Sequence, residues 1–281
     1  MILDCRNIKK QELLKLKMQN HPQITLVVIT IGKFLESAIY LKNKKKLATD
    51  LNVKILELAY DDSHSKKEIM SRIMQLNKDS KITGIMIQKP ILPSFSFQEL
   101  IDCIDYWKDV EGLTTKNKKL LTSGVLNIVP CTARAVLKVL EEYQVLLVNR
   151  KIAIIGKSDL VGMPLYHILK KDNFVTLCDS KTENLREITI NSDIVITAIG
   201  KANYFTKEYF RDGQVIIDVG TNYLDGNLVG DVNFKEVQEL DVMITPVPGG
   251  VGQLTPVYLY SNLFQLDSSK IDKYKKTSNT I

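Results

Sequence analysis

This sequence of 281 residues is poor in several features, and each scarcity excludes a class of protein. The four cysteines are far apart and form no Cys-x-x-Cys pair, which argues against a disulfide framework or a zinc site and fits a reducing cytoplasm. The three histidines are also scattered, so we expect no metal site. No stretch approaches eighteen consecutive apolar residues, so we expect no membrane span. The first residues do not have the pattern of a secretory signal, and we therefore expect a cytoplasmic protein.

The net charge of +6 does not by itself indicate a nucleic-acid partner. The densest basic runs are at 42–46 and 270–276, and aromatic residues are not interleaved to make a binding stripe. We expect a solvated helix face and a polar tail there, and no nucleic-acid partner. A positive field would also attract a polyanionic small molecule.

Apolar runs of strand length alternate with helical patterns along the whole chain. In the first half we predict strands over 23–31, 53–59 and 82–87, with helices over 35–50, 66–76 and 97–104. In the second half we predict a helix over 133–142 and strands over 151–155, 174–178, 193–199, 214–219 and 242–244. Such alternation is typical of α/β domains with parallel sheets covered by helices.

The polar, lysine-rich segment 113–123 divides the two series, and we interpret it as a domain junction. The apolar stretch 256–266 predicts a helix that returns to the first domain. The predicted architecture therefore has two α/β domains. One comprises residues 1–122 and 254–281, and the other, Rossmann-like, comprises 123–253.

The strand at 151–155 runs into a turn that suits a phosphate group. Gly156 ends the strand and Gly162 opens a helix, in the order G-x5-G. A glycine at a strand end lets the backbone approach a pyrophosphate, and a helix N-terminus offers free N–H groups. Pro164 suits the first helical turn, where its missing donor is not needed. An ordinary tight strand–helix turn explains the same spacing equally well, because the pattern is not G-x-G-x-x-G.

The end of the next strand usually distinguishes NAD from NADP. Asp179 lies there and can accept a hydrogen bond from a ribose hydroxyl, which favours NAD. It would repel a 2′-phosphate unless Lys157 or Lys181 offsets its charge. Asp179 can also serve only as a turn residue that bonds its own backbone.

Tyr40 and Lys44 are four positions apart on a predicted helix, so their side chains share a face. A tyrosine hydroxyl beside a lysine can transfer protons if the lysine is partly desolvated. The pair is also common on solvated helices, and context must decide. That context is a set of turns rich in glycine, proline or acidic residues, mostly after strands or at helix ends, at 88–93, 108–112, 130–132, 218–222 and 246–252.

Together these segments resemble the bifunctional methylenetetrahydrofolate dehydrogenase/cyclohydrolase family over residues 24–265. The resemblance rests on Ser37 with Tyr40 and Lys44, Gln88 with its prolines, KDVEG at 108–112, PCT at 130–132, GKSDLVGMP at 156–164, DVGTN at 218–222, VGDV at 229–232 and TPVPGGVG at 245–252. The last motif and the G-x-S-x-x-V-G-x-P form are the most specific.

The resemblance implies oxidation of 5,10-methylenetetrahydrofolate to the methenyl form, followed by hydrolysis to 10-formyltetrahydrofolate. Lys44 would be the main acid/base group, Tyr40 would stack on or position the folate, Gln88 would tune Lys44, and Glu111 would hold the pterin ring. The implied dinucleotide residues are Gly156, Lys157, Ser158, Asp179, Ser180 and Thr221, and Pro248, Gly249 and Gly250 would contact the substrate. The resemblance also implies a cleft between the domains and a homodimer formed through the second domain.

Four positions depart from the family pattern. Glu111 stands where the family has Asp, and a displacement of about 1 Å can cost on the order of 100-fold in rate. Lys89 follows Gln88, and it would lower the pKa of Lys44 if it pointed into the cleft. Lys157 replaces an Arg, and Asp179 replaces a His. We therefore expect NADP as cofactor with NAD possible, and a preference relaxed or shifted towards NAD.

Two alternatives stay open on the sequence. One is a dehydrogenase that has lost the hydrolytic step through Glu111 and Lys89. The other is a folate- or dinucleotide-binding protein without catalysis, which could bind RNA through its lysine runs. Intact Tyr40, Lys44 and Gln88 argue against the second alternative.

Overall fold

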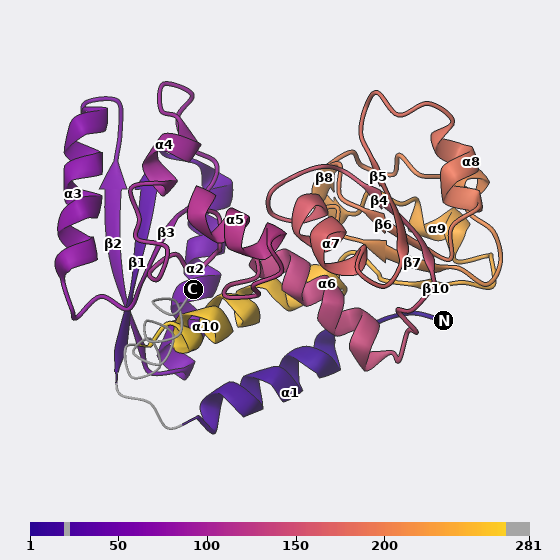
Figure 1. The fold of residues 1–281 in the computed structure, drawn as a ribbon, viewed down its shortest axis with the longest axis horizontal. Coiled ribbons are helices and arrows are strands. Elements are labelled where there is room, and N and C mark those ends of the chain that lie inside the picture. The colour runs from indigo at the N-terminus through magenta and orange to yellow at the C-terminus, as the bar shows by residue number, and fades with distance from the viewer. Residues whose placement is uncertain (20–22, 268–281) are drawn as a thin grey trace. The chain divides into compact units, whose positions relative to one another are not determined.

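The structure is a computed structural model that describes residues 1–19 and 23–267, with the backbone alone for residues 35–40. The lysine-rich tail at 270–276 lies outside the described residues. The described chain forms two compact units, one of residues 14–120 with 259–267 and the other of Met1–Leu13 with Leu121–Tyr258 (Figure 1). Each contains a parallel sheet with its own helices, which confirms the predicted α/β class.

The unit formed by residues 14–120 and 259–267 is built on a three-stranded parallel sheet of order β2-β1-β3. Its strands are β1 (Ile24–Ile31), β2 (Val53–Tyr60) and β3 (Gly84–Ile87). The central strand is almost entirely buried, and Val28 is in register with Glu57 on one side and Met86 on the other. Its helices are α2 (Leu35–Asp50), α3 (Lys66–Lys78), α4 (Phe97–Ile101) and α5 (Thr115–Thr122).

Helix α3 shows how local sequence fixes an element of this unit. The hydroxyl of Ser65 accepts a hydrogen bond from the Glu68 N–H, and the Glu68 carboxylate accepts one from the Ser65 N–H, which completes a capping box. Ile69, Ile73 and Leu76 are buried at the spacing of one helical face. The helix therefore packs its apolar stripe against the unit's core.

Two predictions for this part of the chain differ from the structure in detail. The helix expected over 97–104 is present but ends at Ile101. The segment 113–123, interpreted as a domain junction, contains the division between the two units, after Leu120, but it also contains helix α5. The lysines of α5 obscured its buried side, where Asn117 and Leu121 are 2 % and 6 % exposed. The carboxylate of Asp102 also fixes the helix start, since it accepts hydrogen bonds from the N–H and hydroxyl of Thr115.

The other unit is built on a five-stranded parallel sheet of order β10-β7-β6-β4-β5. Its strands are β4 (Lys151–Ile155), β5 (Phe174–Cys178), β6 (Ile194–Thr197), β7 (Val215–Asp218) and β10 (Met243–Ile244). A two-stranded hairpin, β8 (Asn222–Leu224) and β9 (Asn227–Val229), follows β7. Its helices and 3-10 turns are α6 (Cys131–Glu142), α7 (Gly162–Leu169), α8 (Leu185–Ile190), η1 (Lys207–Tyr209), α9 (Phe234–Val237) and η2 (Val251–Gln253).

Strand β4 marks the point where the strand order of this sheet reverses. The chain pairs β4 with β5 on one side and then with β6 on the other. In open α/β sheets, ligands bind beyond the carboxyl ends of the strands at such a switch point. The loops that follow β4 and β6 are therefore the expected position of a ligand in this unit.

The first residues of the chain belong to the unit with the five-stranded sheet. Leu3 donates its N–H to the Ile244 carbonyl, and Ile244 donates its own to the Met1 carbonyl, so this segment extends along β10. Helix α1 (Arg6–Lys17), which the sequence analysis did not predict, follows it, and α10 (Thr255–Gln265) lies close to the predicted 256–266. Residues 1–13 thus belong to the same compact unit as residues 121–258. The boundaries at 122 and 254 that we predicted for the two functional domains stay a prediction.

Candidate functional site

The ammonium group of Lys44 donates a hydrogen bond to the side-chain oxygen of Gln88. Lys44 lies on α2, and Gln88 follows β3, whose carboxyl end points to the same edge as that of β1. Gln88 is 8 % exposed, and its amide also donates to the Lys89 carbonyl at 2.7 Å. The contact between Gln88 and Lys44 that the resemblance implies is therefore present. Both the oxygen and the nitrogen of the Gln88 side-chain amide are hydrogen-bonded.

Tyr260 on α10 supports the same turn of α2. Its ring is fully buried, and its hydroxyl donates to the main-chain carbonyl of Lys44 at 2.7 Å. This contact could not be predicted from the sequence, because nothing in the local pattern of α10 indicates a partner 216 positions away. Tyr40 lies one turn before Lys44 on α2, but its side chain is outside the part that the structure describes.

A buried carboxylate shapes the turn that carries Glu111. Asp109 is fully buried, and its oxygens accept hydrogen bonds from the N–H groups of Gly112 at 2.9 Å and Thr114 at 2.8 Å, and from the Asn117 amide at 2.9 Å. Such a set of donors fixes the backbone on both sides of Glu111. Asp109 is a second residue whose role the sequence analysis did not assign.

Glu111 lies in an environment that favours its neutral form. Burial raises the pKa of Glu111 to about 7. The negative charge of Asp109 also raises this pKa, whereas the positive charges of Lys44 and Lys89 lower it. A carboxyl group with a pKa near neutrality can both accept and donate a hydrogen bond at physiological pH.

Lys89 lies beside an aromatic ring. Its ammonium group is 3.9 Å from the centroid of the Phe97 ring, and its charge acts on Glu111. A cation at this distance over an aromatic face is held by the ring quadrupole. Lys89 is nevertheless exposed, and its expected effect on the pKa of Lys44 stays a prediction.

In the unit with the five-stranded sheet, two glycines allow the turn between β4 and α7 to close. Gly156 has a φ of +116°, and a Cβ there would lie 2.3 Å from the Ala198 carbonyl oxygen. A Cβ on Gly162 would lie 1.7 Å from the Gly156 carbonyl oxygen. Side chains are excluded at both positions by the protein's own backbone. The glycines alone therefore do not decide between a tight turn and a phosphate site, and the switch point at β4 is the feature that favours a ligand.

Lys157 and Asp179 form an ion pair at this turn. The Lys157 ammonium lies 2.8 Å from the Asp179 carboxylate, and this hydrogen bond is the main reason why the pKa of Asp179 is lowered. Asp179 also accepts from the Lys181 N–H at 2.9 Å and from the Thr182 hydroxyl at 3.3 Å. Asp179 is thus a turn residue and a charge partner at once. Ser158 accepts from the Val161 N–H, and Ser180 is exposed.

Thr221 is exposed in a loop that two buried carboxylates hold. The N–H of Gly220 donates to Asp218, and the amide of Asn222 donates to Asp231. Burial and the neighbouring charge of Asp231 raise the pKa of Asp218 to about 6, although several main-chain donors oppose this. Both aspartates lie in motifs quoted from the sequence, yet no role was predicted for them.

The loop after β10 carries Pro248, Gly249 and Gly250. Gly249 has a φ of +115°, and its carbonyl accepts a hydrogen bond from the Cys5 N–H at 2.9 Å. A Cβ on Gly250 would lie 2.5 Å from the Pro246 carbonyl oxygen. The first residues of the chain therefore help to fix this loop. The substrate contacts expected of its three residues stay a prediction.

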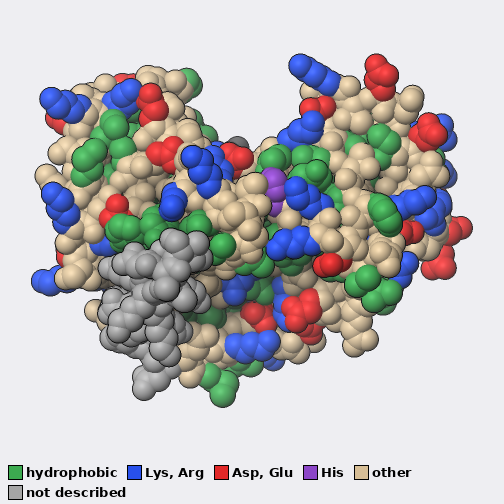
Figure 2. All heavy atoms as spheres, viewed as in Figure 1, with side chains coloured by type: hydrophobic (Ala, Val, Ile, Leu, Met, Phe, Trp, Pro, Cys, Tyr) green, Lys and Arg blue, Asp and Glu red, His purple; other side chains and the backbone are tan. Residues whose placement is uncertain are grey.

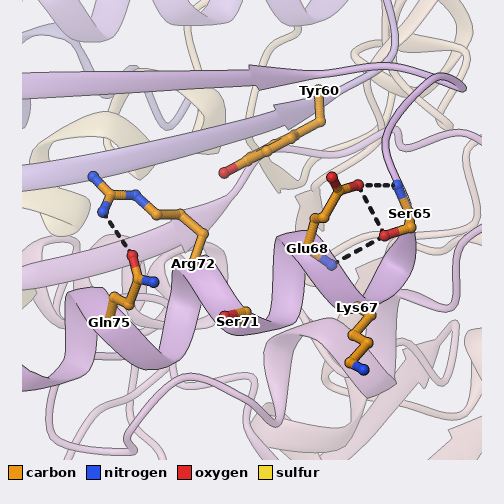
Figure 3. A pocket seen from close by; sticks show the side chains of 7 residues that line it. All are labelled: Tyr60, Ser65, Lys67, Glu68, Ser71, Arg72 and Gln75. Atoms are coloured by element: carbon orange, nitrogen blue, oxygen red, sulfur yellow. Dashed lines mark hydrogen bonds between the residues drawn. The ribbon is translucent and has the colours of Figure 1, made fainter.

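A surface pocket of about 490 Å³ lies elsewhere, between the end of β2 and the exposed side of α3. Its lining includes none of the predicted site residues, and four of its polar side chains bond to one another in pairs. Figure 3 shows Ser65 bonded to Glu68 in the capping box and Arg72 bonded to Gln75. We assign no chemistry to this pocket.

The surface charges do not form a single basic stripe on the face shown in Figure 2. Basic and acidic side chains are interspersed there over the described residues. Exposed ion pairs of the described chain include Lys45 with Glu57 and Lys66 with Glu99. Within residues 1–19 and 23–267, no helix is long and apolar enough to cross a membrane.

Comparison with known families matches both halves of the chain. Residues 4–111 match the catalytic domain of tetrahydrofolate dehydrogenase/cyclohydrolase, and residues 130–271 match the NAD(P)-binding domain of the same family. "Bifunctional protein FolD" of Clostridium novyi is 37% identical over 92% of this chain and 94% of its own length. "Bifunctional protein FolD" of Rickettsia massiliae is 38% identical over 90% of this chain and 89% of its own length.

Solved structures agree with the sequence relatives. The FolD methylenetetrahydrofolate dehydrogenase/cyclohydrolase of Campylobacter jejuni superposes with a TM-score of 0.92 at 31% identity, covering 96% of this chain and 99% of that one. The Trypanosoma brucei enzyme, solved with NADP and an inhibitor, gives a TM-score of 0.89 at 27% identity, covering 96% and 98%. The chain therefore belongs to the tetrahydrofolate dehydrogenase/cyclohydrolase family.

Proposed function

We propose that this protein oxidises 5,10-methylenetetrahydrofolate with a nicotinamide dinucleotide and hydrolyses the methenyl product to 10-formyltetrahydrofolate. The observation that carries the proposal is the hydrogen bond from Lys44 to Gln88 beside Glu111, in a chain that matches both domains of the family. The oxidation removes a hydride from the methylene carbon. The hydrolysis adds water to the methenyl carbon, breaks one carbon–nitrogen bond and releases a proton.

Lys44 holds and moves the proton in the hydrolytic step. Its amine can accept a proton from the attacking water, and its ammonium form can return one to the departing folate nitrogen. The carbonyl oxygen of Gln88 accepts from the Lys44 ammonium, which sets the position of the reacting nitrogen. Tyr260 fixes the helix turn beneath it through the Lys44 carbonyl. Tyr40 is proposed to position the folate.

Glu111 is proposed to hold the pterin ring through its exchangeable hydrogens. Its carboxyl group is one methylene longer than the aspartate usual in the family, and the turn set by Asp109 fixes where it starts. Because its pKa is raised to about 7, it can present both an acceptor and a donor to a ring that has both kinds of group.

The dinucleotide is proposed to bind at the carboxyl ends of β4 and β6. When bound, it supplies the hydride acceptor. Gly156, Lys157 and Ser158 line the turn before the α7 N-terminus, and Thr221 lies on the loop after β7. The fit rests on the switch point at β4, beyond which the turn into the N-terminus of α7 lies.

We propose NADP as cofactor with NAD also accepted, and a preference relaxed towards NAD relative to other members of the family. The ion pair between Lys157 and Asp179 supports this, since the aspartate neutralises the cation that a 2′-phosphate would need. The aspartate can in turn accept from a free ribose hydroxyl.

We further propose a cytoplasmic homodimer formed through the dinucleotide-binding domain. Phe174 supports the dimer, because it is 68 % exposed on β5, the edge strand of the five-stranded sheet. Light scattering of the purified protein measures its molar mass and so tests the oligomeric state directly. A monomer at micromolar concentration would remove this part of the proposal.

Two separate assays test the proposed function. Reduced nicotinamide is followed by absorbance with methylenetetrahydrofolate and either cofactor, and hydrolysis is followed by the loss of methenyltetrahydrofolate without dinucleotide. Both activities are expected. Turnover in the first assay alone would mean that the hydrolytic step has been lost, and turnover in neither would leave a binding protein.

A further inference from the structure

Asp231 is a fully buried carboxylate at the end of the β8–β9 hairpin segment. Its oxygens accept hydrogen bonds from three consecutive main-chain N–H groups, those of Ile199 at 2.6 Å, Gly200 at 3.2 Å and Lys201 at 2.8 Å. The side-chain amide of Asn222 is a fourth donor at 3.1 Å. An ionised carboxylate has enough lone pairs for four donors, and a neutral amide does not.

A second buried carboxylate holds Asp231 itself in place. Asp218, at the end of β7, accepts from the N–H groups of Asp231 at 3.0 Å and Val232 at 2.9 Å. Two glycines make room for this arrangement. A Cβ on Gly230 would lie 1.8 Å from Asp218, and one on Gly220 would lie 2.4 Å from Asp231.

The loop that Asp231 holds forms one wall of the proposed dinucleotide site. The three N–H donors follow Ala198, whose carbonyl oxygen faces Gly156 so closely that no side chain fits there. Ala198 also donates its own N–H to the Ile155 carbonyl at 2.8 Å, which joins the ends of β6 and β4. The position of the Gly156 turn therefore depends on the loop 198–201.

Asp231 also reaches the other wall of the site. Its bond to Asn222 and the bond from Gly220 to Asp218 hold the residues on both sides of Thr221. One buried carboxylate thus bonds directly to the loop after β6 and to Asn222 beside Thr221, and Ala198 links that β6 loop to the turn after β4. None of its four donors belongs to the residues assigned above to the dinucleotide.

We propose that Asp231 is the positioning residue of the dinucleotide site, which sets the spacing between the Gly156 turn and the Thr221 loop. The inference rests on the proposed function, since it assigns that site to a nicotinamide dinucleotide. Asp231 acts through the loops and does not touch the cofactor. Its loss should weaken dinucleotide binding while leaving chemistry on the folate alone unchanged.

Asp231→Asn is the decisive variant, because it keeps the size and removes the charge. The amide nitrogen would face main-chain donors, so at least one buried N–H would lose its acceptor. We expect KM for the dinucleotide to rise about 10- to 100-fold, which corresponds to one or two unsatisfied buried groups. Asp225→Asn is the matched control, since Asp225 is exposed at the tip of the same hairpin.

The experiment measures KM and kcat for the dinucleotide, the dissociation constant of the reduced dinucleotide by fluorescence, and cyclohydrolase activity without dinucleotide. We expect Asp231→Asn to raise KM and the dissociation constant together, with cyclohydrolase activity within about twofold of wild type. Unchanged KM and dissociation constant in a folded variant would overturn the inference.

A second variant covers the possibility that Asp231→Asn does not fold. Asn222→Ala removes only one of the four donors, and it should raise KM by less while keeping cyclohydrolase activity. Unchanged dinucleotide KM in Asn222→Ala, or equal losses of both activities, would then overturn the inference. A wild-type protein that neither binds nor reduces the dinucleotide would instead contradict the proposed function.

Discussion

The ammonium group of Lys157 lies 2.8 Å from the carboxylate of Asp179. Lys157 is at the start of the β4–α7 turn, and Asp179 directly follows strand β5. The pair joins the two residues at which this chain departs from the family pattern near the proposed dinucleotide. The negative charge of Asp179 therefore offsets the positive charge of Lys157. A cation that could bind a 2′-phosphate is occupied, and an acceptor suited to a ribose hydroxyl is in place.

Asp179→Asn should shift cofactor preference towards NADP. The substitution frees Lys157 to meet a 2′-phosphate, and it retains an oxygen for the Lys181 N–H. A charge-assisted hydrogen bond gained in this way predicts a rise of about tenfold in the ratio of kcat/KM for NADP to that for NAD. Glu183→Gln, an exposed acid in the following turn, should leave the ratio unchanged. A strong NADP preference in the wild type that also survives Asp179→Asn would contradict this account.

Lys44→Met should abolish the hydrolytic step. The variant keeps the aliphatic stem but removes the group that moves the proton, and such groups contribute about 10²- to 10⁴-fold. Lys45→Met is the control, because Lys45 is exposed on the same helix and pairs with Glu57 at 2.5 Å. Loss of methenyltetrahydrofolate is measured without dinucleotide. Hydrolysis at the wild-type rate in Lys44→Met would remove Lys44 from the mechanism.

Glu111→Gln should change how stability depends on pH. The pKa of Glu111 is raised from 4.5 to about 7 in the folded protein, so the folded state binds the proton more tightly than the unfolded state. Its contribution is therefore fully present below about pH 4.5, and it is lost as pH rises through 7. Relative to Glu111→Gln, the wild type should lose stability between pH 5 and about 7 and then change no further.

Urea unfolding of both proteins between pH 5 and 9 measures the difference. The glutamine variant should be the more stable protein at pH 8, because it carries no charge to bury. A wild type that gains stability relative to the variant over this range would show that the carboxylate is favoured in the folded state.

Gly162→Ala should disrupt the turn before α7. The new Cβ would overlap the Gly156 carbonyl oxygen, and relieving that overlap costs about 1–3 kcal/mol of folding free energy. We expect weaker dinucleotide binding and a lower midpoint of unfolding. Gly252→Ala is the matched control, since a Cβ there meets nothing within 4 Å. Identical behaviour of the two variants would mean that the turn relaxes without consequence.

The sequence was sufficient for features whose signal is local. Strand β4 reads as a short apolar run, and Lys44 and Gln88 lie in recognisable motifs, so their proximity could be expected. Helix α5 was missed because its lysines mask a buried side centred on Asn117.

Features that depend on distant contacts could not be predicted. The carboxylate of Asp231 is bonded to main-chain donors about 30 positions earlier, and every residue type except proline can supply a main-chain N–H. Tyr260 likewise reaches Lys44 across 216 positions. Polar residues with partners of this kind show no periodicity, so only the fold reveals what they hold.

The central claim is that one chain both oxidises and hydrolyses a folate-bound one-carbon unit, with Lys44 serving the hydrolysis. The most direct test supplies purified protein with methylenetetrahydrofolate and NADP or NAD, and records reduced nicotinamide together with the methenyl intermediate. The account predicts reduced nicotinamide with either cofactor, little accumulated methenyltetrahydrofolate in the wild type, and clear accumulation or loss of turnover in Lys44→Met. No reduced nicotinamide with either cofactor, or equal amounts of methenyltetrahydrofolate in the wild type and an active Lys44→Met variant, would contradict it.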